Sequence, residues 1–286
     1  MASLRDTKTR IKSVENTQQI TRAMKMVSAA KLRRAQEAIV QARPYANKIK
    51  EILGKIKLYS REKMHPLISY NPGNREEIVL VSSDKGLCGG FNANVFRMVL
   101  KYIAENKNEK DISLTIIGKK GKEYFKRRDF NVSQTYVDLY DNLNYNSIDF
   151  LVKYITDLYL SKERSTIYFA YNEFKSAINQ NPTLEKLLPI EPIELAHEEV
   201  LIDYTYEPNK DDIVTDLLHE GIHVQIYRMF LESVSSEHSA RMTAMENATN
   251  NADDMISKLT LLYNRARQSA ITTEIIEIVS GAEALK

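Results

Sequence analysis

The 286-residue chain contains one cysteine, no tryptophan, nine glycines and seven prolines. A single cysteine, Cys88, excludes an intrachain disulfide framework and is typical of a reducing compartment. No apolar run approaches the roughly 20 residues that span a bilayer as a helix, so we expect no membrane insertion. The first residues lead directly into helical periodicity and show no signal or transit peptide. The remaining composition, 43% hydrophobic with a net charge of +2, indicates a globular protein rather than a disordered one.

The last quarter of the chain, 211–286, carries apolar or small residues at seven-residue intervals in two interleaved rows. The first row is Leu217, Val224, Leu231, His238, Met245, Ala252, Leu259 and Ala266; the second is Tyr227, Val234, Arg241, Ala248, Met255 and Leu262. Two such rows are typical of the a and d positions of a coiled coil. Because no proline follows Pro208, the pattern predicts one helix to about Gly281, roughly 105 Å long at 1.5 Å per residue. A helix of that length needs a partner.

The N-terminal segment, 1–57, is predicted to form that partner helix. Its apolar row is looser and consists of Leu4, Ile11, Val14, Ile20, Met24, Val27, Ala35, Ala38, Ala42, Ile49, Ile52 and Ile56. Pro44 is expected to bend or interrupt the helix. Residues 3–57 carry about 14 basic and 4 acidic side chains, whereas 211–286 carry about 6 and 12. Opposite charges at the two ends of the chain favour an antiparallel pair.

The lengths of the two helices predict that about 20 residues at the C-terminus extend beyond the pair. This end carries apolar side chains on several faces, namely Ile271, Ile275, Ile276, Ile278, Val279 and Leu285. An isolated helix of this length is marginal in water, and exposed apolar surface favours association. Membrane insertion is the alternative, but the run is short and contains Glu274 and Glu277. We therefore expect another protein to enclose this end.

The middle of the chain, 75–205, is predicted to form a Rossmann-like α/β domain. Expected strands are 78–81, 112–117, 130–137 and 165–171, and expected helices are 92–105, 119–128 and 147–161. Alternation of this kind predicts a mainly parallel sheet with right-handed crossovers. A polar loop is expected to follow the last strand toward Pro182, and 189–206 is expected to return the chain to the coiled coil. The predicted fold is thus a long antiparallel coiled coil plus a central α/β domain.

Three features could carry chemistry. The turn 83–92 is rich in glycine, but it matches neither dinucleotide nor phosphate-loop patterns, so a tight strand-to-helix turn is the favoured interpretation. His219, Glu220 and His223 fit the HExxH pattern of zinc peptidases. No following segment folds back to supply a third ligand, and Gly221 inside a helix favours a packing contact. Cys88 has no base nearby in sequence and is expected to be buried.

Three segments of the chain resemble the gamma subunit of F-type ATP synthases. They are KTRIKSVENTQQITRAMKMVSAAKLRRAQ near the start, VSSDKGLCGGFN in the middle and YNRARQSAITTEIIEIVSGAEAL at the end. The terminal run, with Ile271, Thr272, Glu274, Glu277, Gly281 and Ala282, is similar to the family signature and is highly specific. The resemblance covers essentially the full length. It implies a non-catalytic rotor shaft, without cofactor or metal, inside a hexamer of alpha and beta subunits that bind the nucleotides.

The resemblance also implies partner contacts. For the beta subunits, the corresponding positions are Met24, Lys25, Arg241, Arg267, Gln268, Thr272 and Glu274. For the epsilon subunit and the c-ring of the membrane sector, they are Tyr204, Tyr206 and Glu207. The basic residues Arg22, Lys25, Lys31, Arg33 and Arg34 could form a track for an acidic segment of beta. A role in hydrogen ion transport is implied as well. The lack of a transit peptide indicates a bacterial protein in a peripheral position on the cytoplasmic side of the cell membrane, although a mature organellar chain would look similar. The chloroplast form has a regulatory cysteine pair that this chain lacks.

Two other functions are possible from the residues alone. A zinc peptidase would bind about one metal per chain and lose it on His219→Ala. A coiled-coil nucleic-acid-binding scaffold could use the basic N-terminal helix, and its binding would then depend steeply on salt. The acidic C-terminal helix would neutralise much of that surface, so nucleic acid is not an expected partner.

Overall fold

A computed structural model of the chain describes residues 4–59, 65–140, 143–176, 179–190, 207 and 209–283. The two longest elements are α1 (Leu4–Tyr59) and α5 (Lys210–Glu283), near the bounds predicted for them. Between them lie β1 (Arg75–Val81), α2 (Phe91–Asn106), β2 (Asp111–Ile117), α3 (Lys119–Phe125), β3 (Val132–Tyr136), a short 3-10 helix (Tyr145–Ile148), α4 (Asp149–Leu160), β4 (Thr166–Phe174) and β5 (Gln180–Leu188). The chain divides into a first unit, 1–29 with 241–286, and a second unit, 30–240.

The second unit is built around a five-stranded sheet in the order β3-β2-β1-β4-β5. The first four strands are parallel, and β5 runs antiparallel to β4. Successive side chains of β1 point to opposite faces. Ile78 and Leu80 pack with residues of α2 and α3, whereas Val79 and Val81 pack with residues of α4 and α5. The sheet is therefore covered by helices on both faces, as a parallel sheet requires.

Most elements of the central domain were predicted, but its last strand was not. The segment around Pro182 was expected to be a polar loop, and the structure places it in β5, with Pro182 opposite Asn172 of β4. Proline cannot donate to a ladder, and it is tolerated in a strand at the edge of a sheet. β5 is such an edge, which is why a polar, proline-containing sequence forms a strand here. Most of 189–206, expected to return the chain to α5, lies outside the described residues.

Pro44 does not interrupt α1, which continues through it to Tyr59. The proline removes the backbone donor that would pair with the carbonyl of Val40, one turn earlier. Both residues are exposed, so water can take the place of the lost hydrogen-bond partner. Of the two predicted effects, the interruption was therefore wrong, because the proline lies on the solvent side of the helix, and a bend at Pro44 stays a prediction.

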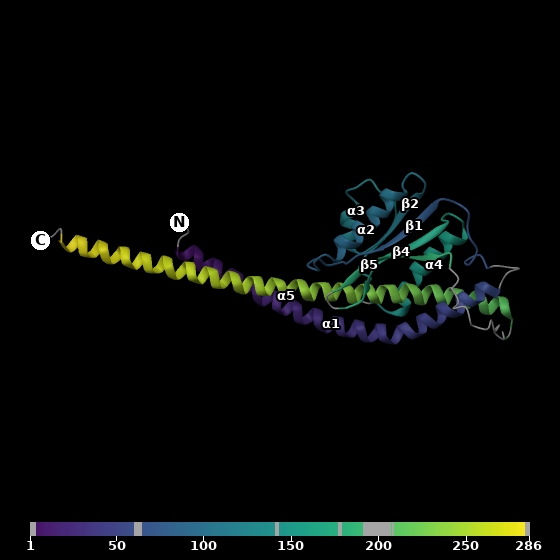
Figure 1. The fold of residues 1–286 in the computed structure, drawn as a ribbon, viewed down its shortest axis with the longest axis horizontal. Coiled ribbons are helices and arrows are strands. Elements are labelled where there is room, and N and C mark those ends of the chain that lie inside the picture. The colour runs from purple at the N-terminus through teal and green to yellow at the C-terminus, as the bar shows by residue number, and fades with distance from the viewer. Residues whose placement is uncertain are drawn as a thin grey trace. The chain divides into compact units, whose positions relative to one another are not determined.

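In the first unit, α1 and α5 lie side by side and run in opposite directions. Gln18 bonds to Asp253, Thr21 to Thr249 at 2.8 Å between hydroxyl oxygens, and Lys25 Nζ to Glu246 Oε1 at 2.6 Å. Residue numbers rise along one helix as they fall along the other. Figure 1 shows the C-terminal end of α5 continuing past the N-terminal end of α1, as the lengths of the two helices predicted.

The less exposed positions of α1 follow a regular alternation of three and four residues. The positions in this alternation are Leu4, Thr7, Ile11, Val14, Gln18, Thr21, Lys25 and Ser28, continued in the second unit by Leu32, Ala35, Ile39, Ala42, Ala46 and Ile49. Other positions of intermediate exposure, such as Met24 and Ala38, lie next to them. Ile20 and Val27, which were assigned to the contact row, are 59% and 58% exposed. At these two places the predicted contact row was wrong by one position. The true contact positions are held by the polar residues Thr21 and Ser28, which are buried.

In the second unit, α5 is enclosed on all sides between residues 220 and 240. No residue from 220 to 240 is exposed, although the stretch includes Glu232, Ser233, Ser235, Ser236 and Glu237. One side packs on the sheet, where Ile226, Met229 and Phe230 belong to the same apolar core as the strands. On the other side Gln225 donates from Nε2 to the carbonyl of Ala46 in α1 at 2.8 Å. The helix is thus held between α1 and the sheet.

Candidate partner-binding site

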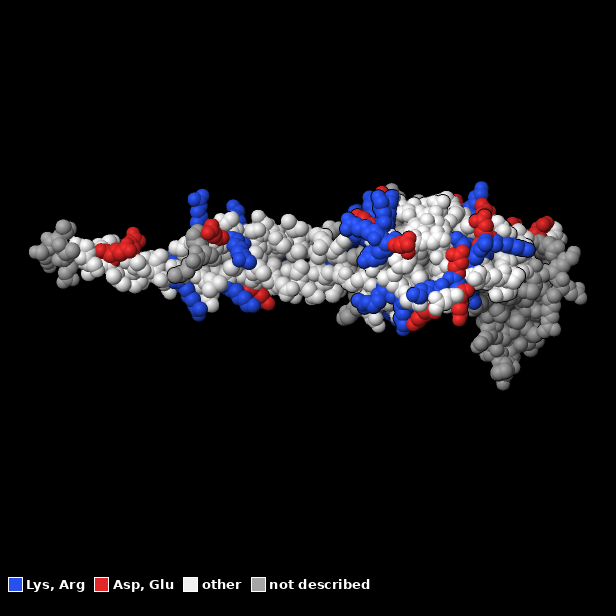
Figure 2. Space-filling model, turned by 90° about the horizontal axis from the view of Figure 1, so that it is seen from above, with Lys and Arg blue, Asp and Glu red and all other residues white. Residues whose placement is uncertain are grey.

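The end of α5 is the most exposed apolar surface of the first unit. Every residue from 264 to 282 is exposed. Ile271, Ile275, Ile276, Ile278 and Val279 are each between 48% and 65% exposed. In Figure 2 this end of the helix is mostly white, interrupted by acidic side chains. Contiguous exposed apolar side chains on a soluble domain mark a surface that another protein covers.

Four of the predicted partner-binding residues lie on this exposed end. Arg267, Gln268, Thr272 and Glu274 all have exposed side chains. The Thr272 hydroxyl donates to the carbonyl of Gln268 at 2.9 Å, a bond within its own helix. The charged and amide groups extend from a continuous helix, which gives them a defined spacing. Their contact with beta subunits stays a prediction.

The remaining predicted residues have different environments. Met24 and Lys25 are half-buried, and Lys25 forms an ion pair with Glu246 of α5. Arg241 is buried within the chain. Tyr204 and Tyr206 lie outside the described residues, and Glu207 is exposed. The other basic residues of the predicted track are all exposed; they are Arg22, Lys31, Arg33 and Arg34.

Of the HExxH residues, Glu220 and His223 contact neighbouring elements, whereas His219 is exposed. His223 is buried, with Nε2 at 2.7 Å from Asp149 Oδ1 and its ring 3.9 Å from that of Tyr145. The Tyr145 hydroxyl donates to Glu220 Oε1 at 2.7 Å. Among the described residues, no three His, Cys, Asp or Glu side chains are grouped as a metal site would need. Glu220 and His223 are thus engaged by Tyr145 and Asp149, in agreement with the packing interpretation.

The glycine-rich turn is closed by its own side chains. Asn92 accepts from the backbone N–H of Ser83 at 3.0 Å and donates to the Ser83 hydroxyl at 2.7 Å. Ser82 accepts from the N–H of Gly121 at 2.9 Å, which joins this turn to the start of α3. Cys88 is buried beside Phe91 and Ala240, as predicted. The interpretation as a tight strand-to-helix turn accounts for these contacts.

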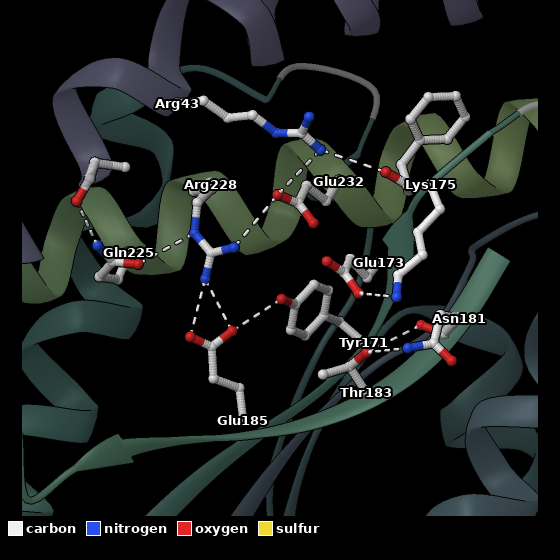
Figure 3. A network of polar contacts seen from close by, with 12 residues as sticks. Arg43, Tyr171, Glu173, Lys175, Asn181, Thr183, Glu185, Gln225, Arg228 and Glu232 are labelled. Atoms are coloured by element: carbon white, nitrogen blue, oxygen red, sulfur yellow. Dashed lines mark hydrogen bonds and ion pairs between the residues drawn. The ribbon is translucent and has the colours of Figure 1, made fainter. Parts of the chain in front are cut away.

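A network of charged residues in the second unit was not singled out from the sequence (Figure 3). Arg228 of α5 binds Glu185 of β5 through Nη2 at 2.8 and 3.1 Å, and Glu232 through Nη1 at 3.3 Å. Arg43 of α1 lies 3.6 Å from Glu232 Oε1 and donates to the carbonyl of Phe174 at 3.3 Å. We call Arg43, Tyr171, Glu185, Gln225, Arg228 and Glu232 the Arg228 network. The available signal was a charged i,i+4 pair, Arg228 and Glu232, between apolar positions of a long helix.

The structural likeness to solved proteins agrees with the described fold. The chain is similar to a chain of the Euglena gracilis mitochondrial ATP synthase, solved as OSCP/F1/c-ring, with a TM-score of 0.68 at 17% identity, covering 99% of this chain and 94% of that one. It is also similar to a chain of the central stalk/c-ring of the Tetrahymena thermophila mitochondrial ATP synthase, with a TM-score of 0.62 at 24% identity, covering 80% and 99%. In the part of the chain that the structure describes, no helix combines the length and apolar character that a bilayer crossing requires.

Sequence comparison identifies the family. A family profile described as ATP synthase matches residues 3–285. Proteins named ATP synthase gamma chain from Geobacter metallireducens and Geotalea daltonii are each 48% identical over 287 residues, covering all of both chains. One from an Anaeromyxobacter strain is 47% identical over 290 residues with the same full coverage. The chain therefore belongs to the ATP synthase gamma chain family.

Proposed function

We propose that this chain couples ion flow through a membrane sector to ATP synthesis and hydrolysis in a hexamer of alpha and beta subunits. As a gamma chain it is the central-stalk rotor subunit, and it is not itself an enzyme, because catalysis belongs to the beta subunits. The observation that carries the proposal is the end of α5, a continuous helix with apolar side chains exposed from Ile271 to Val279. A lone amphipathic helix cannot bury these groups without another protein.

The two long helices form an antiparallel coiled coil in this proposal. Its support is the alternation of three and four residues among the less exposed positions of α1. Contacts such as Thr21 with Thr249 and Ala46 with Gln225 have the opposed numbering that antiparallel helices require. The corresponding domains are 1–57 and 211–286 for the coiled coil and 75–205 for the central α/β domain. The coiled coil is the part that would transmit rotation.

Rotation of such a helix pair would change the state of each catalytic subunit in turn. A ligand or partner shifts a conformational equilibrium only as far as its contacts differ between the two states. The exposed end of α5 presents apolar Ile275 on one part of its surface and charged Arg267 and Glu274 on others. A surrounding ring of subunits would therefore meet a different surface at each angle. Met24, Lys25, Arg241, Gln268 and Thr272 complete the proposed contacts with beta.

The segment that precedes α5 in the sequence is proposed to meet the epsilon subunit and the c-ring. Tyr204, Tyr206 and Glu207 are the residues that the family resemblance assigns to this contact. The solved relatives come from assemblies described as central stalk/c-ring and OSCP/F1/c-ring. The chain would then lie at the cytoplasmic side of the cell membrane as a peripheral subunit. Its contribution to hydrogen ion transport would be mechanical.

Removal of residues 268–286 tests the role of the exposed end. Since every side chain from 268 to 282 is exposed, the truncated chain is expected to keep its fold. Assembly with the alpha and beta subunits should weaken, measured by co-purification and by ATP hydrolysis of the complex. A matched variant replaces Ile275 and Ile276 with serine and keeps the helix length. Unchanged assembly and unchanged coupled turnover in both variants would contradict the proposal.

A further inference from the structure

The Arg228 network joins four elements of the second unit, namely α1, α5, β4 and β5, in a closed set of contacts (Figure 3). From α5, Arg228 reaches β5 through Glu185, whose Oε2 also accepts from the hydroxyl of Tyr171 in β4 at 2.9 Å. Arg228 Nε donates to Gln225 Oε1 at 3.1 Å, and Gln225 donates onward to α1 at Ala46. A second set of contacts links α5 to β4 through α1: Glu232 pairs with Arg43 of α1, and Arg43 donates to the carbonyl of Phe174 in β4.

The central charges of the network are shielded from water. The side chains of Arg228, Glu185 and Glu232 are 13%, 22% and 3% exposed. A buried charge that loses its partner is strongly unfavourable, because neither water nor another group replaces the lost bonds. The planar guanidinium of Arg228 also donates to its two acceptor carboxylates in a fixed geometry. Its position relative to Glu185 is therefore closely defined.

The apolar contacts around the network do not define a position in the same way. Ile226, Met229 and Phe230 pack α5 against the strands, and such contacts are non-directional. A helix displaced along its axis by one turn, about 5.4 Å, can bring new apolar side chains into the same place. The same displacement would separate the guanidinium of Arg228 from Glu185. Arg228 would keep Glu232 on its own helix, whereas the shielded carboxylate of Glu185 would lose its ion pair and keep the hydroxyl of Tyr171.

We propose, on the basis of the rotor function proposed above, that the Arg228 network fixes the axial and rotational register of α5 and α1 against the sheet when torque passes between them. Arg228, Glu185, Glu232 and Arg43 act as positioning residues: they touch no nucleotide and prevent the helices from slipping under load. The apolar core holds α5 against the sheet, and the Arg228 network determines the one axial and rotational position that α5 takes there.

The test uses the full chain assembled in the ATP synthase complex in membrane vesicles. The main variant replaces the charges with apolar residues of similar size, Arg43→Met, Glu185→Leu, Arg228→Met and Glu232→Leu together. Such replacement of a whole buried network is often tolerated for folding, whereas removal of one partner is not. Arg43→Met alone is the second variant, since the Arg43 side chain is 43% exposed and its loss leaves Arg228 paired with Glu185 and Glu232. Ile226→Ala is the matched control, because it weakens the same core of α5 without touching a charge.

Two measurements separate register from stability. Spin labels at exposed Asp216 of α5 and Lys101 of α2, in a Cys88→Ala background, report the distance between the helix and the sheet domain. ATP-driven membrane potential divided by ATP hydrolysis reports coupling. We expect the fourfold variant to show a second distance population, shifted on the scale of one helical turn, about 5 Å, and a loss of potential per ATP hydrolysed. Arg43→Met should show the same loss to a smaller degree, and Ile226→Ala should lower thermal stability while keeping the parental distance and coupling ratio.

The proposal is overturned if the fourfold variant and Arg43→Met keep both the parental distance distribution and the parental coupling ratio. It is equally overturned if Ile226→Ala loses coupling to the same extent as the charge variants, because general weakening would then explain the effect. Should the fourfold variant fail to fold, Arg43→Met decides by the same two readouts. Failure of the unmodified chain to support coupled turnover would instead refute the rotor function itself.

Discussion

The carboxylate of Glu77 and the guanidinium of Arg164 form an ion pair, Nε to Oε2 at 3.0 Å, in the interior of the second unit. Glu77 belongs to the central strand β1 and has no exposed surface. Its other donors come from the neighbouring strands: Thr115 Oγ1 at 2.7 Å and Ser113 in β2, and Ser133 Oγ at 3.2 Å in β3. One carboxylate thus links three adjacent strands and Arg164, which lies two residues before β4.

Replacing Glu77 with alanine should destabilise the chain by about 3–5 kcal/mol, because a buried ion pair would be broken. Arg164, which has little exposure, would keep only the more distant carboxylate of Asp111, with Oδ2 3.8 Å from Nη1. Thermal unfolding of the isolated chain, followed by circular dichroism, measures the effect. Glu105→Ala is the matched control, since it removes an exposed i,i+4 pair with Lys101; such pairs contribute about 0–1 kcal/mol. Equal effects of the two substitutions would show that the buried pair adds nothing to stability.

The hydroxyl pair Thr21 and Thr249 should show coupling rather than additivity. Each single replacement by valine removes the bond between the two hydroxyls and should cost about 0.5–1.5 kcal/mol. The remaining hydroxyl keeps only the carbonyl of its own helix, that of Gln18 for Thr21 or that of Met245 for Thr249. The double replacement keeps the branched shape on both helices and should be close to neutral, since two matched apolar groups need no hydrogen bond. A double-mutant cycle on the helical melting transition measures this, and costs that simply add would contradict the contact.

Gly118 should tolerate no side chain. It has φ of +98°, and a Cβ atom there would lie 2.0 Å from the carbonyl oxygen of Ser82. Gly118→Ala is therefore expected to lower stability by about 2 kcal/mol or more, through both strain and displaced backbone. Gly281 is the control: a Cβ there meets nothing within 4 Å, and alanine should favour the helix by about 1 kcal/mol. Chemical denaturation of the two variants would reveal opposite signs.

Glu232 should give stability a dependence on pH. Burial raises the pKa of its carboxyl group, although Arg228 and Arg43 act in the opposite direction. A carboxyl whose pKa is higher in the folded state contributes stability below its unfolded pKa of about 4.3, and loses this contribution as the pH rises through the folded pKa. The stability of Glu232→Gln relative to the parent should therefore increase between pH 4 and pH 7. A relative stability that falls over this range would mean that the ion pairs outweigh burial.

Periodicity in the sequence predicted the long helices and their free end, because a seven-residue repeat and a length mismatch are local properties of the chain. It misplaced Ile20 and Val27, since Thr21 and Ser28 occupy contact positions that a search for apolar residues passes over. Strand β5 was missed because Pro182 and its polar neighbours suit an edge, and edges are defined by the sheet rather than by the strand.

The charged network was out of reach for a different reason. Glu185 and Arg228 are 43 residues apart, and nothing in either sequence neighbourhood indicates that β5 will lie against α5. The exposed end of α5 could be predicted without knowledge of any distant contact, since its exposure follows from having no partner within the first unit. What could be predicted depends on how far apart the interacting residues lie in the sequence. Local patterns could be predicted, and pairs of charges far apart in the sequence could not.

The enclosure of α5 from 220 to 240 has a consequence for sequence divergence. A helix with one solvent face can accumulate substitutions there at little cost, and this stretch has no such face. Any change in it has to be accommodated by α1, by the sheet or by both, so accepted mutations are expected to occur together with compensating ones. In 264–282 nothing within the first unit imposes that restriction; whatever restrains those positions must come from other polypeptides.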